Sequence, residues 1–342
     1  MVNQIEITKQ DNLLDENGHL KLQGWSRKHL LSYNRENLGK GWFRTKEWDY
    51  YAIINPDYAI TFTITDLGIM GLYSVVWLDF KEKKFIPDEE AKFFTKGRTD
   101  MPLSPLKGNV EYTGKSLEIK FLKNNSTRTI NFNYPSFNKN EGIKGKLELF
   151  QDPDMDSITI ATPWKNKPKC FYYNTKINCM PTKGKVVLGN RIFTFNKENS
   201  FAVLDWGRGI WPYSDTWYWG SASGKSGKAL VGFNIGYGFG DTSAASENIF
   251  YYNNVGHKLD QVTFHYNPEN FLESWKFISN DKRFEMDFEP IIDRNSIVNL
   301  LIFKSIQHQV FGYFTGEVIL DDGRAIKIEK LLGFAEVVKN RW

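Results

Sequence analysis

Apolar and polar residues alternate along most of this chain. The segment "YAITFTIT" (residues 58–65) has an apolar residue at every second position, with threonines between several of them. Two further alternating runs flank an Asn-Asn-Ser turn in "SLEIKFLKNNSTRTINFNY" (residues 116–134), which predicts a hairpin. Because successive side chains of a strand point to opposite faces, a period of two predicts β-structure.

Turn residues separate the alternating runs. "KVVLGNRIFTF" predicts a turn at residues 189–190, and "HQVFGYFTGEVILDDGRAIKIEKL" predicts another at residues 321–323. About eighteen short strands can be placed in this way, and almost no stretch has a helical period. The pattern is typical of β-sandwiches and β-barrels, so we expect an all-β fold.

The two halves of the chain resemble each other in their spacing. Trp48 precedes apolar positions 60, 62 and 64 by the same twelve, fourteen and sixteen residues that separate Trp217 from positions 229, 231 and 233. A chain of 342 residues also suits two domains. We therefore predict a duplicated antiparallel β-barrel with domains at residues 1–170 and 171–342. Three prolines interrupt the strand pattern around this boundary, at positions 163, 168 and 181.

The charge and hydropathy of the chain exclude two classes of partner. Its 44 Lys and Arg nearly balance its 40 Asp and Glu, without a run of five or six like charges, so no nucleic-acid partner is expected. The N-terminus lacks a signal-peptide pattern, and no apolar run is long enough for a transmembrane segment. We expect a cytoplasmic protein. The sequence does not indicate its oligomeric state.

Motifs for cofactors and metals fail when their spacing is compared with the known patterns. "GSASGKS" (residues 220–226) has three residues between its glycines where a phosphate-binding loop has four, and a strand follows it. "DPDMDS" (residues 152–157) has Ser157 where a calcium loop has glycine. The five histidines form no pair at metal-ligand spacing. The sequence therefore predicts neither a cofactor nor a metal.

Candidate chemistry is concentrated in "DWGRGIWPYSDTWYWG" (residues 205–220), which holds four of the eleven tryptophans. This exceeds the aromatic surface that one strand face needs, so part of it should border a cavity. The predicted ligand-binding residues here are Trp211, Tyr213, Trp217 and Trp219. Asp205 and Arg208 are the catalytic candidates at the polar end of the cavity. The alternative is that Asp205 and Arg208 form a structural ion pair, because structural and catalytic pairs look alike in sequence.

The first half contains a similar set in "GWFRTKEWDYY" (residues 41–51). Arg44, Lys46, Trp48 and Tyr50 follow a period of two and would share one strand face. We predict ligand binding by Arg44, Trp48 and Tyr50. The alternative is a solvated basic face whose aliphatic stems cover the aromatic residues.

The C-terminal segment "LLGFAEVVKNRW" (residues 331–342) is too apolar for a frayed tail. We expect it to pack on the second barrel. A buried Glu336 would need a basic partner, and Arg208 and Arg341 are the candidates.

Four segments carry a resemblance to a known family. "GWSR" (residues 24–27), "NRENLGKGWFRTKEWDYY" (residues 34–51), "DWGRGIWPYSDTWYWG" and "DDGRAIKIEKLLGFAEVVKNRW" (residues 321–342) together resemble the bacterial domain-of-unknown-function 2804 family. That family is distantly similar to tandem lipocalin-like proteins, which include carotenoid hydratases, AttH-like proteins, lipid-binding survival factors and fungal pericyclases. The resemblance implies two tandem lipocalin-like antiparallel β-barrels with a ligand cavity. It implies no reaction, because barrels support many activities.

Two functions fit these expectations. In the first, an aromatic-lined barrel cavity binds a small, largely apolar or cyclic molecule, and the charged residues act on it as a cofactor-independent hydratase, dehydratase or isomerase. In the second, the protein is a non-enzymatic carrier of a lipid or isoprenoid, and the charged residues orient its polar head. The sequence does not decide whether the protein is an enzyme.

Overall fold

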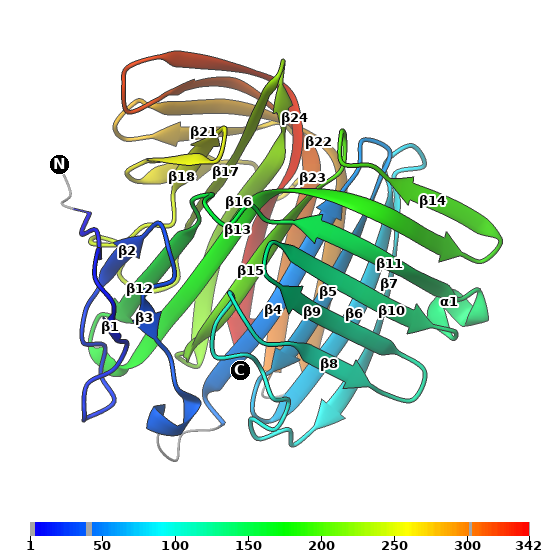
Figure 1. Cartoon of the computed structure of the whole chain (residues 1–342), viewed down its shortest axis with the longest axis horizontal. Coiled ribbons are helices and arrows are strands. Elements are labelled where there is room, and N and C mark those ends of the chain that lie inside the picture. The colour runs from blue at the N-terminus through cyan, green and yellow to red at the C-terminus, as the bar shows by residue number, and fades with distance from the viewer. Residues whose placement is uncertain (1–3, 39–42, 301–302, 342) are drawn as a thin grey trace.

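A computed structural model describes residues 4–38, 43–300 and 303–341 (Figure 1). Gly41 and Trp42 of the "GWFRTKEWDYY" motif and the terminal Trp342 lie outside the described residues. Within these ranges the only helices are a 3₁₀ helix, η1 (Arg35–Leu38), and the short α1 (Phe137–Asn140). No helix in the described part is long and apolar enough to cross a bilayer. The predicted all-β fold is confirmed.

The first sheet has thirteen strands in the described part of the chain. Ten follow one another by hydrogen bonding: β7 (Lys84–Phe93), β6 (Met70–Asp79), β5 (Tyr58–Asp66), β4 (Thr45–Ile54), β15 (Phe201–Ile210), β13 (Lys167–Leu188), β11 (Ile143–Phe150), β10 (Thr127–Tyr134), β9 (Glu118–Asn124) and β8 (Val110–Thr113). The remaining three are β12 (Ile158–Trp164), β2 (Gly24–Ser26) and β14 (Arg191–Phe195). A small parallel pair, β1 (Asp11–Asn12) and β3 (Leu31–Ser32), lies near the N-terminus.

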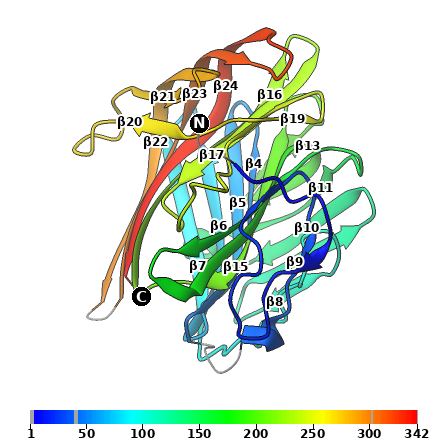
Figure 2. The same cartoon turned by 90° about the vertical axis from the view of Figure 1, so that its left-hand side faces the viewer.

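The second sheet has nine strands among the described residues. Their order is β19 (Val255–Lys258), β18 (Ile249–Tyr252), β17 (Ala229–Tyr237), β16 (Ser214–Ser226), β24 (Ala325–Arg341), β23 (Phe303–Ile319), β22 (Phe284–Leu300), β21 (Trp275–Ser279) and β20 (Val262–His265). Both large sheets curl into half-barrels, and the long strands β22, β23 and β24 lie beside β4 and β5 (Figure 2).

The three predicted turns are present. Residues 125–126 join β9 to β10, residues 189–190 join β13 to β14, and residues 320–324 join β23 to β24. The C-terminal segment is also ordered as predicted, because β24 pairs with both β16 and β23 and buries Phe334 and Val337.

Apolar side chains at every second position of the central strands fill the interior of each half-barrel. On β5, Ile60, Phe62 and Ile64 are completely buried in the core of the first half-barrel. The second half-barrel has its own core around residues such as Phe233 and Phe277. Both interiors are therefore packed with side chains.

A third apolar cluster joins the outer faces of the two half-barrels. Tyr50 of β4 meets Trp219 of β16 edge to face, with ring centroids 5.7 Å apart. Phe311 and Phe334 extend the cluster on the second sheet. Burial of a large apolar side chain contributes about 1.5–3 kcal/mol, so this cluster holds the two sheets together.

The change from the first sheet to the second falls between Ile210 and Ser214. The predicted boundary after residue 170 instead falls inside β13, which is hydrogen-bonded within the first sheet. The division into domains of residues 1–170 and 171–342 stays a prediction.

Candidate functional site

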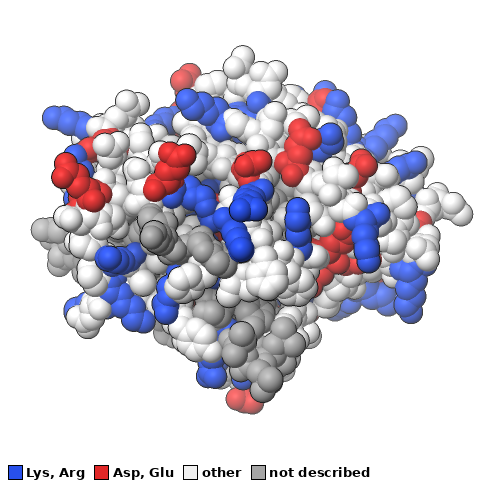
Figure 3. All heavy atoms as spheres, turned by 90° about the horizontal axis from the view of Figure 1, so that it is seen from below, with Lys and Arg blue, Asp and Glu red and all other residues white. Residues whose placement is uncertain are grey.

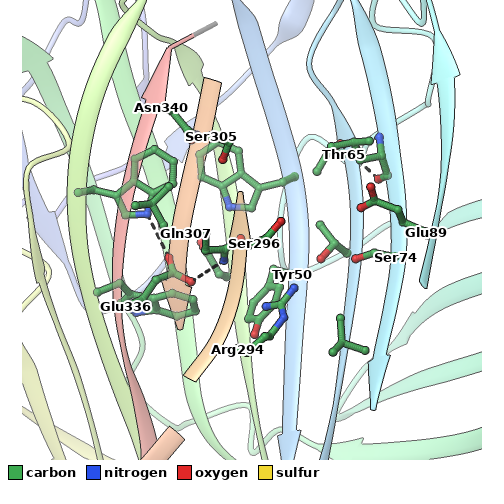
Figure 4. A pocket seen from close by; sticks show the side chains of 18 of the residues that line it. Tyr50, Thr65, Ser74, Glu89, Arg294, Ser296, Ser305, Gln307, Glu336 and Asn340 are labelled. Atoms are coloured by element: carbon green, nitrogen blue, oxygen red, sulfur yellow. Dashed lines mark hydrogen bonds between the residues drawn. The ribbon is translucent and has the colours of Figure 1, made fainter. Parts of the chain in front are cut away.

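A cavity of about 540 Å³ lies between the two sheets (Figure 4). The first sheet contributes side chains from β4, β5, β6, β7, β13 and β15, and the second contributes side chains from β16, β22, β23 and β24. The sequence predicted a cavity inside a barrel. The structure places it between the half-barrels, because their interiors are filled by their own apolar residues.

Aromatic side chains form much of the cavity wall. The aromatic residues that line it are Trp48, Tyr50, Phe85, Tyr172, Trp211, Trp217, Trp219 and Phe239. Trp48 stacks on Tyr172 at 5.7 Å, and Trp211 meets Trp217 edge to face at 5.3 Å. Trp217 and Trp219 both face the cavity, as their spacing of two on β16 requires.

Two of the predicted ligand-binding residues lie outside this wall. Arg44 precedes β4 and is exposed, and Tyr213 in the β15–β16 connection is 46% exposed. Neither is among the described residues that line the cavity. Trp48, Tyr50, Trp211, Trp217 and Trp219 are among them.

Asp205 faces the cavity from β15 and is held by two neighbours on β13. The Nζ atom of Lys176 lies 2.8 Å from its Oδ1 atom, and the Asn174 amide donates to the same oxygen at 2.6 Å. Lys176 also lies 3.8 Å from the buried Glu247 carboxylate and 4.2 Å from the centre of the Trp219 ring. Asp205 therefore belongs to a buried charge cluster at the cavity wall.

Arg208 does not share this site. Asp205 and Arg208 are three positions apart, so their side chains point to opposite faces of β15. Arg208 is completely buried in the first half-barrel, where it donates to Asp49 at 2.9 Å and lies 4.1 Å from the centre of the Trp206 ring. Its guanidinium also donates to three backbone carbonyls, those of Trp48, Pro102 and Gly207.

Glu336 faces the cavity from β24, and no described residue forms a salt bridge with it. It accepts hydrogen bonds from the Trp217 indole at 3.1 Å and the Gln307 amide at 3.0 Å. Burial raises the pKa of the Glu336 carboxyl, although the hydrogen bonds from Gln307 and Trp217 and the nearby charge of Arg294 lower it in part. The predicted ion pair with Arg208 or Arg341 is wrong, because Arg208 points into the first half-barrel and Arg341 lies on the opposite face of β24.

Asp205 and Glu336 occupy matching positions in the two halves. Asp205 pairs with Tyr50 in the β15–β4 register, and Glu336 pairs with Trp219 in the β24–β16 register. On the other side, β13 places Asn174 and Lys176 where β23 places Gln307 and Gln309. Asn174 and Gln307 accordingly make the same hydrogen bond, each to the carboxylate of its own half.

Residues at the matching positions of each half also contact the other half across the interface. Lys176 of the first half lies against Trp219 of the second, and Gln309 of the second half hydrogen-bonds the Tyr50 hydroxyl of the first. At these matching positions the halves differ in one charge, since Lys176 corresponds to the neutral Gln309. One carboxylate therefore has a cationic partner and the other has neutral donors.

The buried Glu247 gives a testable pH dependence. Burial raises the pKa of its carboxyl from 4.5 to about 7, so ionisation of Glu247 disfavours the folded state. The folded state is therefore favoured while Glu247 is protonated. This contribution to stability is fully present below pH 4.5 and is lost as the pH rises through 7. For Glu247→Gln we expect this loss to disappear, which raises the stability of the variant relative to the wild type by about 3 kcal/mol between pH 4.5 and 8. Urea unfolding at both pH values measures it. If the wild type and Glu247→Gln lost the same stability between pH 4.5 and 8, Glu247 would not be the group responsible.

Sequence reasoning missed Lys176, Asn174, Glu247 and Gln307. A lysine within the largely apolar run "CFYYNTKINCM" (residues 170–180) and the glutamines at a period of two in "IQHQV" (residues 306–310) were usable signals. Glu247 lies in a polar loop before β18 and has no such signal.

The described residues contain no group of three or more His, Cys, Asp or Glu side chains that could hold a metal ion. Cys170 and Cys179 are free thiols buried away from each other on β13. The absence of a cofactor from the reaction stays a prediction.

Two curled antiparallel sheets in tandem, with a ligand-sized cavity between them, define a double lipocalin-like protein. Residues 4–342 match the model of the family described as domain of unknown function (DUF2804). The chain belongs to this family, which confirms the resemblance seen in its sequence motifs. No curated protein matches the sequence.

Solved structures share this fold at low sequence identity. The crystal structure of CghA with Sch210972 has a TM-score of 0.55 and 10% identity, and covers 97% of both chains. A putative AttH (NE1406) from Nitrosomonas europaea has a TM-score of 0.49 and 12% identity, covering 86% of this chain and 92% of that one. Kievitone hydratase from Nectria haematococca has a TM-score of 0.46 and 10% identity, covering 87% and 88%. The similarity to CghA confirms the tandem lipocalin-like fold.

Proposed function

We propose that this protein binds a small, largely apolar or cyclic molecule in the cavity between the sheets and acts on it by acid–base chemistry. A volume of about 540 Å³ suits such a molecule, since ligand pockets span about 300–1,000 Å³. The CghA structure contains Sch210972. At 10% identity that similarity supports the fold alone, so the ligand class is inferred from the cavity of this chain.

The observation that carries this proposal is the pair of cavity carboxyl groups in unlike environments. Lys176 balances the charge of Asp205, whereas Glu336 has neutral donors and a raised pKa caused by burial. Two carboxyl groups in one site with unlike electrostatic environments are typical of an acid and base pair. We assign Glu336 as the proton donor and Asp205 as the proton acceptor.

These roles suit addition of water to a double bond, its reversal, or migration of the bond. Glu336 gives a proton to one carbon, and Asp205 takes a proton from the attacking water or from a neighbouring carbon. The aromatic faces of Trp48, Trp217 and Trp219 stabilise the positive charge that develops on the substrate. Each cycle returns both carboxyl groups to their starting states once protons exchange with solvent.

The same wall suits a non-enzymatic carrier of a lipid or isoprenoid, in which the two carboxyl groups only orient a polar head. The experiments distinguish the two functions. Mass spectrometry of molecules extracted from the native protein identifies the bound compound, and incubation of that compound with ligand-free protein shows any conversion. Recovery of the compound unchanged, at wild-type occupancy, would favour the carrier and overturn the acid–base assignment.

The cavity wall is tested by Trp217→Ala. Removing this indole exposes bound ligand to solvent and takes one donor from Glu336, so we expect affinity to fall by about 2 kcal/mol, or roughly thirtyfold. The comparison variant is Tyr213→Ala, whose side chain lies outside the cavity and whose ligand occupancy should stay at the wild-type level. Titration with the extracted compound gives both affinities. Equal affinities for the two variants would place the ligand elsewhere.

A further inference from the structure

The cavity-facing row of β7 continues into exposed aromatic surface. Phe85, Pro87 and Glu89 line the cavity at alternating positions, so Phe93 lies on the same face at the end of the strand. Phe93 is 65% exposed, and the next residue, Phe94, is 67% exposed. Two adjacent phenylalanines therefore extend into solvent beside the cavity.

Further apolar side chains lie beside these phenylalanines. The backbone of Phe94 donates to the carbonyl of Ile69 in the β5–β6 turn. Lys46 donates to the carbonyls of both Leu67 and Phe43, which brings Phe43 to the same turn. Ile69 and Phe43 are 45% and 49% exposed. We call Phe43, Ile69, Phe93 and Phe94 the apolar rim.

The backbone of this segment is strained where the rim is most exposed. Phe94 has a φ of 59° and Lys96 has a φ of 54°, in the left-handed region that bulky residues rarely adopt. Such strain persists at sites with a function, and large exposed apolar patches mark interaction surfaces. An unfavourable backbone conformation that turns a phenylalanine outward indicates a contact with another surface.

Exposed cations lie close to the rim residues along the chain. The neighbouring exposed cations are Arg44, Lys92, Lys96 and Arg98. The acidic groups near them are the exposed Asp100, the buried Asp66, which accepts hydrogen bonds from Thr95 and Thr99, and, further along β7, Glu89 and Glu90. In Figure 1, β7 ends at the lower edge of the molecule, and the view from below in Figure 3 shows Lys and Arg side chains, with Asp and Glu side chains among them, on this face. Aromatic side chains flanked by cations match the interface of an anionic bilayer.

We propose that the apolar rim docks on the surface of an anionic lipid bilayer. The rim side chains enter the interfacial region, and the surrounding cations lie near the lipid phosphates. This places the end of β7, and with it the cavity, next to the bilayer. Transfer of an apolar ligand between bilayer and cavity rests on the proposed function, whereas docking itself does not.

Vesicle sedimentation with ligand-free protein tests the docking. We expect wild-type protein to bind vesicles of phosphatidylcholine containing about one third phosphatidylglycerol, and to be released at high salt. Phe93→Ser/Phe94→Ser should weaken this binding at least tenfold. Lys92→Gln and Arg98→Gln should each weaken it about fivefold, as expected for loss of one cation near the surface.

Two control variants match these changes at exposed positions away from the rim. Ile192→Ser and Lys225→Gln should bind the vesicles as the wild type does. Equal binding by the wild type and by both sets of rim variants would overturn the proposal, as would equal binding to pure phosphatidylcholine vesicles. A wild-type dimer that the phenylalanine variant dissociates would identify a second copy as the partner instead. None of these results depends on turnover, so they leave the proposed reaction to its own tests.

Discussion

Arg208→Met is expected to lower the free energy of unfolding by about 3–5 kcal/mol, because it leaves the buried Asp49 without its cation. Arg208 has no exposed surface and makes all of its contacts inside the first half-barrel. Urea unfolding followed by circular dichroism measures the loss.

A surface arginine provides the matched control for this change. Arg191 lies 3.7 Å from Glu141 and is more than half exposed, so Arg191→Met should change stability by less than about 1 kcal/mol. Arg208→Met/Asp49→Leu should recover part of the loss, since an apolar pair leaves no unpaired charge. A stable but inactive Arg208→Met protein would instead support the catalytic role predicted for Arg208 from the sequence.

Asp205→Asn is expected to lower turnover of the extracted compound by about 10²–10⁴-fold, because an amide cannot accept the proton that the proposed reaction transfers. The fold should persist. Asn174 can donate to the amide oxygen in the same position, and Lys176 keeps its contacts with Glu247 and Trp219. Single-turnover kinetics measures the rate, and circular dichroism reports the fold.

Asp57→Asn makes the same chemical change at an exposed turn and should keep wild-type turnover. If Asp205→Asn unfolds the protein at the temperature of the assay, Asp205 is a structural residue. If it folds and turns over normally, Asp205 is not the proton acceptor.

Local alternation was sufficient to predict most of the fold. A period of two located the central strands and hairpins, and the repeated spacing around Trp48 and Trp217 matched β4–β5 with β16–β17. The same rule, applied to Asp205 and Arg208, would have separated them, because residues three apart on a strand face opposite ways. The pair was joined in the prediction by closeness in sequence alone.

Predicting the position of the cavity requires knowing which faces of the two sheets pack against each other. The outer faces of β4 and β16 carry tryptophans, and sequence alone does not tell a face that lines a barrel from one that packs on a second barrel. Lys176 and Glu336 lie 160 residues apart, yet their strands border one cavity. Such a constellation depends on tertiary contacts that no local pattern records.

The single charge by which the matching cavity positions differ has a consequence for how such a site can be assembled. In a two-fold symmetric dimer of identical half-length chains, the positions of Lys176 and Gln309 would hold the same residue, because symmetry repeats every side chain. Both carboxyl groups would then have equal surroundings and equal affinities for a proton. Joining the halves in one polypeptide lets each position vary separately. Covalent linkage is therefore what permits one cavity carboxyl group to have a cationic partner while the other has only neutral hydrogen-bond donors.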